Sequence, residues 1–164
     1  TLADGTFIIT KIVGNKRTDQ GALDLAEAID LVTKEEYIKG FRKALNLIID
    51  QSGKEGAVLW HCSEGKDRCG MVSVLVLKML GVDEETIRSD YLFTNKVNVP
   101  KAKALYERLK NEVGEEIAMA AYKAFVADEE YLDAALDNMG DDFIEKTLGI
   151  THDRVEEFKR NILI

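Results

Sequence analysis

The stretch of sequence that decides the fold is Ala57-Val58-Leu59-Trp60-His61-Cys62-Ser63-Glu64-Gly65-Lys66-Asp67-Arg68-Cys69-Gly70. A short apolar run precedes Cys62, and an apolar helical pattern follows over residues 71–80. This order predicts a buried strand over residues 57–61, a tight loop, and a helix whose N-terminus faces that loop. Backbone N–H groups converge on an anion in such a setting.

Cys62 lies where its thiol would be activated. A free cysteine has a pKa of about 8.5, which falls to roughly 3.5–7.5 beside a helix N-terminus and a cation. Arg68 is the cation we expect, because its planar donors can hold two equatorial oxygens of a phosphate, a bidentate task that lysine cannot perform. A thiolate facing an anion site suits hydrolysis of phosphate esters through a phosphocysteine intermediate.

The remaining loop residues have expected supporting roles. Gly65 allows the backbone to turn with its N–H groups inward, and Gly70 allows the helix to pack closely on the strand. His61 is expected to order the loop through hydrogen bonds, with its side chain pointing away from Cys62. The expected substrate-binding positions are Ser63, Glu64, Gly65, Lys66, Cys69 and Gly70.

The cysteines have two other possible roles. Buried cysteines are often inert small hydrophobic residues, but the glycine spacing and the flanking apolar segments favour a functional loop. A zinc site is rejected because Cys62 and Cys69 with His61 and His152 do not form a four-ligand set. We therefore expect no metal and no other cofactor.

The pattern His-Cys-x-x-Gly-Lys-Asp-Arg-x-Gly resembles the loop of the bacterial and fungal tyrosine phosphatases that also act on phosphoinositides, a group that includes secreted phosphatases of mycobacteria and Listeria. Residues 80–95 are similar to the segment that follows the loop helix in this family, and residues 131–150 resemble its C-terminal helices. The resemblance covers roughly residues 33–164. It implies an α/β fold, with a mainly parallel sheet flanked by helices and a helix-rich C-terminal half.

The resemblance implies a role for each matching position. Cys62 becomes the nucleophile, Arg68 the phosphate clamp, and Asp67 the general acid, which this family takes from inside the loop. Lys66 becomes the position linked to phosphoinositide recognition. A loop-ordering carboxylate is the alternative for Asp67, and a solvated loop charge is the alternative for Lys66.

The chain departs from the family pattern in two places. Cys69 stands where the family usually has threonine or serine, and a thiol is a weaker donor than a hydroxyl. We therefore expect slower breakdown of the phosphoenzyme, and a reversible Cys62–Cys69 disulfide is a further option. The family's N-terminal segment, with its Asp-Leu-Arg motif, has no counterpart in residues 1–31. We expect a single phosphatase domain over residues 1–164 that lacks this segment.

Composition limits the partners. The 164 residues are 46% apolar and carry a net charge of −8, which argues against nucleic acid as a general partner. The expected partner is a phosphorylated protein or phospholipid substrate. No hydrophobic run approaches the ~20 residues of a transmembrane segment. The cysteine usage favours a reducing compartment, the cytoplasm by default. Secretion stays open because the sequence need not include the natural N-terminus.

Helical periodicity predicts most of the remaining elements. The predicted helices cover residues 22–31, 33–50, 71–80, 100–112 and 114–126, with others beginning at Asp83, Asp128, Asp141 and Thr151. Thr33 and Glu36 have the spacing of a capping box, and residues 6–13 are rich in β-forming side chains.

The predicted function is a metal-independent tyrosine phosphatase, with dual-specificity action on phosphoserine, phosphothreonine or phosphoinositide also considered. Two alternatives remain. One is a non-catalytic phosphate-binding or redox-sensing module. The other is a different thiolate enzyme, such as a sulfurtransferase or arsenate reductase.

Overall fold

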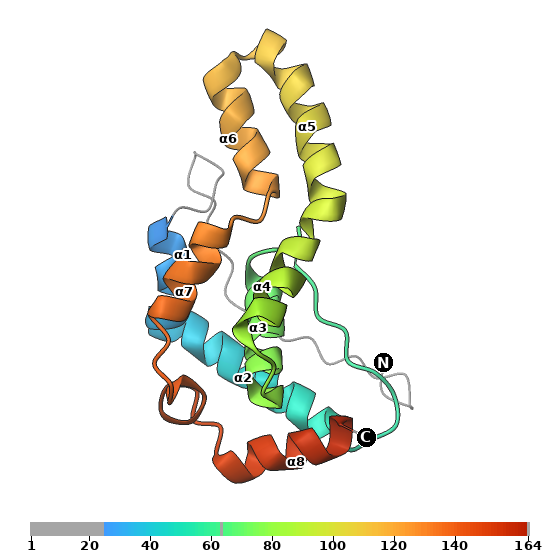
Figure 1. Cartoon of the computed structure of the whole chain (residues 1–164), viewed down its shortest axis with the longest axis vertical. Coiled ribbons are helices and arrows are strands. Elements are labelled where there is room, and N and C mark those ends of the chain that lie inside the picture. Colours follow the sequence, from blue (N-terminus) through green and yellow to red (C-terminus); the bar gives the residue numbers. More distant parts are fainter. Residues whose placement is uncertain (1–24, 63, 164) are drawn as a thin grey trace.

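Helices make up all the regular secondary structure of residues 25–62 and 64–163, which are the residues that the computed structural model of the chain describes (Figure 1). The elements are α1 (Leu25–Thr33), α2 (Glu35–Ser52), α3 (Arg68–Leu80), α4 (Glu84–Phe93), α5 (Asn95–Glu112), α6 (Glu115–Phe125), α7 (Glu129–Asp137), the π-helix η1 (Phe143–Thr147) and α8 (His152–Ile162).

The predicted sheet is wrong for this part of the chain. Residues 57–62 run as coil from the end of α2 toward α3, and Leu59 is 86% exposed (Figure 1). A strand needs a neighbour to pair its backbone N–H and C=O groups, and no described residue forms a strand beside this segment. The β-rich residues 6–13 lie outside the described residues.

Most of the helices match the periodicity, but several helix starts differ. The helix predicted from Asp141 is the short π-helix η1, whose N-cap is Asp142, and α3 begins at Arg68 rather than at residue 71. Thr33 does not form the predicted capping box, because its hydroxyl donates to the carbonyl of Ile29 (2.9 Å) and Lys34 is the N-cap of α2. α5 begins at Asn95 and contains Pro100, which was expected to open it. The side chain of Asn95 exchanges two 2.8 Å hydrogen bonds with the backbone of Ala127, and this contact anchors the first turn ahead of the proline.

The predicted N-caps at Asp83 and Asp128 are confirmed. The Asp83 carboxylate accepts the N–H of Thr86 at 2.9 Å, and the Asp128 carboxylate accepts the N–H of Glu130 at 3.1 Å. Each bond satisfies a backbone donor that the first turn of a helix leaves unpaired.

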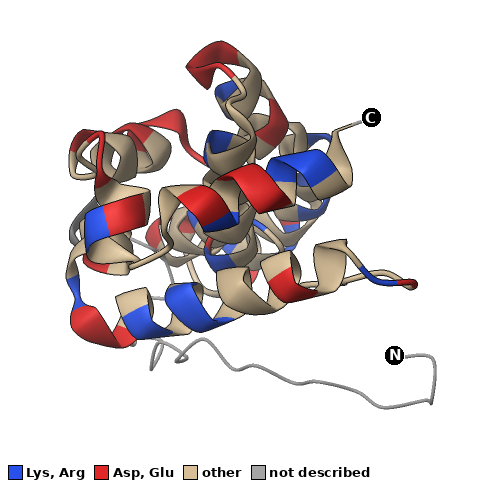
Figure 2. Cartoon of the chain, turned by 90° about the horizontal axis from the view of Figure 1, so that it is seen from below, with Lys and Arg blue, Asp and Glu red and all other residues tan. Residues whose placement is uncertain are grey.

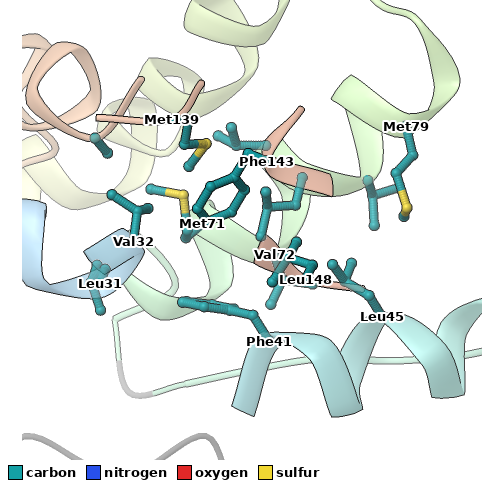
Figure 3. Packing of buried hydrophobic residues seen from close by; sticks show 14 of the residues in the cluster. Leu31, Val32, Phe41, Leu45, Met71, Val72, Met79, Met139, Phe143 and Leu148 are labelled. Carbon is teal, nitrogen blue, oxygen red and sulfur yellow. The ribbon is translucent and has the colours of Figure 1, made fainter. Parts of the chain in front are cut away.

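The hydrophobic core forms around α3, which packs against α2, α4 and α8. Figure 3 shows Phe41 and Leu45 of α2 facing Met71 and Val72 of α3. Other buried members come from α1, α7, η1 and the segments that flank η1; the labelled ones are Leu31, Val32, Met139, Phe143 and Leu148. The core therefore holds α3, and with it the end of the Cys62 loop, on several sides.

Polar contacts join the C-terminal elements to α2. The guanidinium of Arg42 donates to the carbonyls of Thr147 and Leu148, both at 2.9 Å, and so pairs carbonyls at the end of η1. Arg154 of α8 forms an ion pair with Asp50 at 2.6 Å. Acidic and basic residues occur along the same helices rather than on separate faces (Figure 2). Among the described residues, no helix is both long and apolar enough to cross a membrane.

Candidate active site

The loop that contains Cys62 follows the coil that begins at residue 53, and it ends at the first turn of α3. Asp67 is the N-cap of α3, and its carbonyl accepts the N–H of Met71 at 2.8 Å. Its carboxylate makes no capping bond. Arg68 and Cys69 therefore begin the helix, and the loop precedes the end at which the helix dipole is positive.

Cys62 is surrounded by hydrogen-bond donors. Its Sγ accepts the N–H of Gly65 at 3.2 Å. A hydrogen bond from the Cys69 thiol is the largest cause of a pKa that falls to about 5, and backbone N–H groups of Cys69, Gly65 and Glu64 add to it, while burial opposes it. The thiolate is thus the dominant form of Cys62 near neutral pH.

Cys69 stays a protonated thiol while Cys62 ionises. Its hydrogen bond to Cys62 raises the pKa of the Cys69 thiol, and burial and the nearby thiolate charge raise it further. Neither cysteine is in a disulfide. The structure therefore brings the two sulfur atoms together with one negative charge, held on Cys62; a disulfide between them stays a prediction.

The two loop glycines have separate structural reasons. Gly65 has a φ of +78°, a left-handed conformation that side chains disfavour. At Gly70 a Cβ atom would lie 2.9 Å from Cε2 of Tyr91. The close packing expected at Gly70 is therefore against α4, and the prediction that a strand lies there is wrong.

Lys66 and Asp67 form an internal ion pair. Lys66 is only 1% exposed, and its Nζ lies 2.9 Å from Oδ1 of Asp67. A lysine is rarely buried without a partner, because removing an ammonium group from water is costly. The alternative of a solvated loop charge therefore does not hold for Lys66.

The other predicted site residues lie around this group. Arg68 is half-buried, and its guanidinium makes no hydrogen bond or ion pair with another described residue. His61 is exposed and has no hydrogen-bond partner in the described part of the chain, so its ordering role stays a prediction. Ser63 lies outside the described residues.

Two residues near the loop were not predicted from the sequence. Asn98 of α5 is buried, and its Nδ2 lies 3.4 Å from the carbonyl oxygen of Glu64. Tyr91 of α4 packs on Gly70, and burial, followed by the negative charge of Asp67, raises the pKa of its phenol. Both are remote from the loop in sequence, and an asparagine near a helix start carries no signal of its own.

Comparison with known proteins agrees with the loop pattern. The model of the tyrosine phosphatase family matches residues 11–164. Triple specificity protein phosphatase PtpB of Mycobacterium tuberculosis is 28% identical over 120 residues, which are 67% of this chain and 43% of that protein. "Putative tyrosine-protein phosphatase H16_A0669" of Cupriavidus necator is 44% identical over 48 residues, 29% of this chain and 17% of that protein. The matched parts span less than half of either relative. With nearly its whole length matched by the family model, the chain belongs to the tyrosine phosphatase family.

Proposed function

We propose that the chain provides the catalytic loop of a cysteine-dependent phosphomonoester hydrolase that acts through a phosphocysteine intermediate. The observation that carries this proposal is the Cys62 thiolate, with its pKa of about 5, surrounded by donors at the start of α3. Arg68 supports it, because its guanidinium is not engaged by the other described residues. Membership of the tyrosine phosphatase family supports the reaction class.

In the first step, Sγ of Cys62 attacks the phosphorus atom while the bond to the ester oxygen breaks. Arg68 binds two equatorial oxygens of the transferring group, where charge accumulates. The leaving oxygen takes a proton from Asp67. Asp67 is paired with Lys66 in the structure, so it must take up its proton when a phosphate anion binds beside it, since a nearby anion favours the neutral acid.

In the second step, a water molecule attacks phosphorus and the P–S bond breaks. Asp67 takes the proton of the water, inorganic phosphate leaves, and Cys62 returns as a thiolate. The Cys69 thiol remains a donor to the sulfur that leaves. It donates more weakly than a hydroxyl would, which supports slow breakdown of the intermediate.

Phosphotyrosine is the proposed leading substrate, and phosphoserine, phosphothreonine and phosphoinositide are secondary ones. The name of the mycobacterial relative, a triple specificity phosphatase, supports a broad range. Lys66 is the proposed source of phosphoinositide activity. Once Asp67 is protonated, Lys66 loses its anionic partner, and its buried Nζ would have to turn outward to reach a second phosphate.

The test is hydrolysis of aryl phosphates by the wild type, Cys62→Ser and Asp67→Asn, each with and without EDTA. Cys62→Ser should lose turnover. Asp67→Asn should slow phenyl phosphate about 10²–10⁴-fold and p-nitrophenyl phosphate much less, because an acidic phenol leaves without a proton donor. Asp90→Asn, an exposed carboxylate on α4, is the matched control and should behave as the wild type.

Each arm has a contrary outcome. Full activity of Cys62→Ser would refute covalent catalysis, and loss on adding EDTA would refute the metal-free reaction. Binding of phosphate or vanadate without turnover would favour the phosphate-binding module. Lys66→Met, which keeps the length of the buried side chain, should reduce hydrolysis of phosphoinositide more than of phosphotyrosine peptide; an equal reduction would remove the specificity role.

A further inference from the structure

Asn98 connects the start of α5 to the Cys62 loop. Its side chain is 5% exposed, and Nδ2 lies 3.4 Å from both the Glu64 carbonyl oxygen and Oγ1 of Thr94. Glu64 and Asn98 are 34 positions apart in the chain. A buried amide needs hydrogen-bond partners, and the loop supplies one that lies close to the nucleophile.

The carbonyl that Asn98 contacts shares a peptide unit with the Gly65 N–H. That N–H donates to Sγ of Cys62 at 3.2 Å. The described residues contain no cis peptide bond, and in a trans peptide the C=O and N–H point to opposite sides. A contact that fixes the direction of the Glu64 carbonyl therefore also aims the Gly65 N–H at the sulfur.

This peptide unit needs an external anchor. A peptide flips through opposite changes in ψ of Glu64 and φ of Gly65, and glycine accepts φ of either sign at little cost. Gly65 now has a φ of +78°, and a Cβ there would meet nothing within 4 Å. A flip would turn the Glu64 carbonyl oxygen toward the thiolate. A hydrogen-bond donor would then be replaced by an oxygen atom whose partial negative charge repels the thiolate.

The first turn of α5, which carries Asn98, is itself held in place by hydrogen bonds. Asn95 lies one helical turn before it and exchanges two 2.8 Å bonds with the backbone of Ala127, between α6 and α7. We propose that Asn98 is a positioning residue that holds the Glu64–Gly65 peptide so that the Gly65 N–H stabilises the Cys62 thiolate. Its consequence for turnover rests on the proposed phosphatase function, whereas its effect on the thiolate does not.

The test is the pH dependence of Cys62 alkylation by iodoacetamide, with the modified peptide identified by mass spectrometry. Asn98→Leu removes the donor at similar size, and Asn98→Ala removes it without adding a charge. Both should move the midpoint from about 5 upward by about one unit, or about tenfold less thiolate at low pH. The charged neighbours Lys66, Asp67 and Arg68 stay in place in each variant.

Thr94→Val is the matched control, because it removes only the other partner of Asn98 and should leave the midpoint unchanged. Asn98→Gln keeps a donor and should restore part of the shift. An unchanged midpoint in folded Asn98→Leu would overturn the inference. If that variant does not fold, Asn98→Ala decides in the same way, because it also removes the donor and adds no charge.

Turnover of phenyl phosphate separates this inference from the proposed function. If both hold, Asn98→Leu loses kcat at acidic pH, near the alkylation midpoint, while Thr94→Val does not. If the wild type does not hydrolyse the ester but the alkylation midpoint shifts as expected, the positioning role stands and the phosphatase proposal fails. If the wild type is active and the midpoint does not move, the phosphatase proposal stands and the positioning role of Asn98 fails.

Discussion

At the scale of single residues, the acidity of Cys62 comes from the groups that donate hydrogen bonds to its sulfur atom. The pattern predicts a thiol acidified by a helix N-terminus and a cation. In the structure, the thiol of Cys69 is the largest cause of the low pKa of Cys62, and backbone N–H groups of Cys69, Gly65 and Glu64 follow. These contacts depend on loop geometry, which residue spacing does not determine.

Replacing Cys69 should therefore change the acidity of Cys62. In Cys69→Ala the pKa of Cys62 should rise from about 5, because the largest donor is lost, and the rate of alkylation should then begin to fall at a higher pH as the solution is acidified. Cys69→Thr keeps a donor at this position and should hold the pKa low while also speeding breakdown of the phosphoenzyme. Alkylation profiles and single-turnover kinetics measure the two effects.

An alkylation midpoint that is the same in Cys69→Ala and the wild type would contradict the role of the Cys69 thiol as the main hydrogen-bond donor to Cys62. Turnover that is unaltered in Cys69→Thr would contradict the expected handicap of the thiol. Lys78→Ala, on the same helix but outside the group of donors around Cys62, serves as the control for general effects on α3.

At the scale of elements, the helical pattern predicted the helices well and the strand wrongly. The apolar run before Cys62 has the composition of a buried strand, but a strand depends on partners elsewhere in the chain. Thr33 and Pro100 mislead for a related reason. Local motifs suggested a capping box and a helix start, while a hydrogen bond to Ile29 and the Asn95 contact with Ala127 decide the outcome. Tertiary contacts override local preference at these places.

The packing of α3 on α4 should make Gly70 intolerant of a side chain. Gly70→Ala would place Cβ 2.9 Å from Cε2 and 3.0 Å from Cδ2 of the buried Tyr91 ring. Overpacking of this kind costs about 1–3 kcal/mol, which exceeds the gain of up to about 1 kcal/mol from replacing glycine in a helix. Urea unfolding should show a net destabilisation.

A double-mutant cycle isolates this contact. In a Tyr91→Leu background the ring is absent, so Gly70→Ala should cost less than it does in the wild type. An equal cost in both backgrounds would mean that the strain arises elsewhere in the loop.

At the scale of the whole molecule, the net negative charge of the protein opposes the approach of the anionic substrate that the proposed site would bind. The net charge is −8, and acidic and basic side chains are interspersed along the helices (Figure 2). The cations of the loop are Arg68 and Lys66, and Lys66 is already paired with Asp67. The long-range field should therefore repel a polyanion that the loop itself would bind.

Salt should consequently favour highly phosphorylated substrates. Raising NaCl from about 20 to about 200 mM shortens the screening length to roughly 10 Å or less. We expect kcat/KM for a soluble inositol polyphosphate to rise a few-fold relative to kcat/KM for a monoester whose single phosphate is its only charged group. A relative decrease with salt would show that local positive potential dominates the approach of substrate.

Trp60 is the one tryptophan of the chain. It lies two positions before Cys62, packs against the core, and donates its indole N–H to Oγ of Ser73 on α3 at 3.3 Å. The indole thus combines an apolar contact with a polar one, and its fluorescence originates beside the Cys62 loop. Binding of phosphate to the Cys62 loop, as proposed, should therefore change the intrinsic fluorescence of the unlabelled chain.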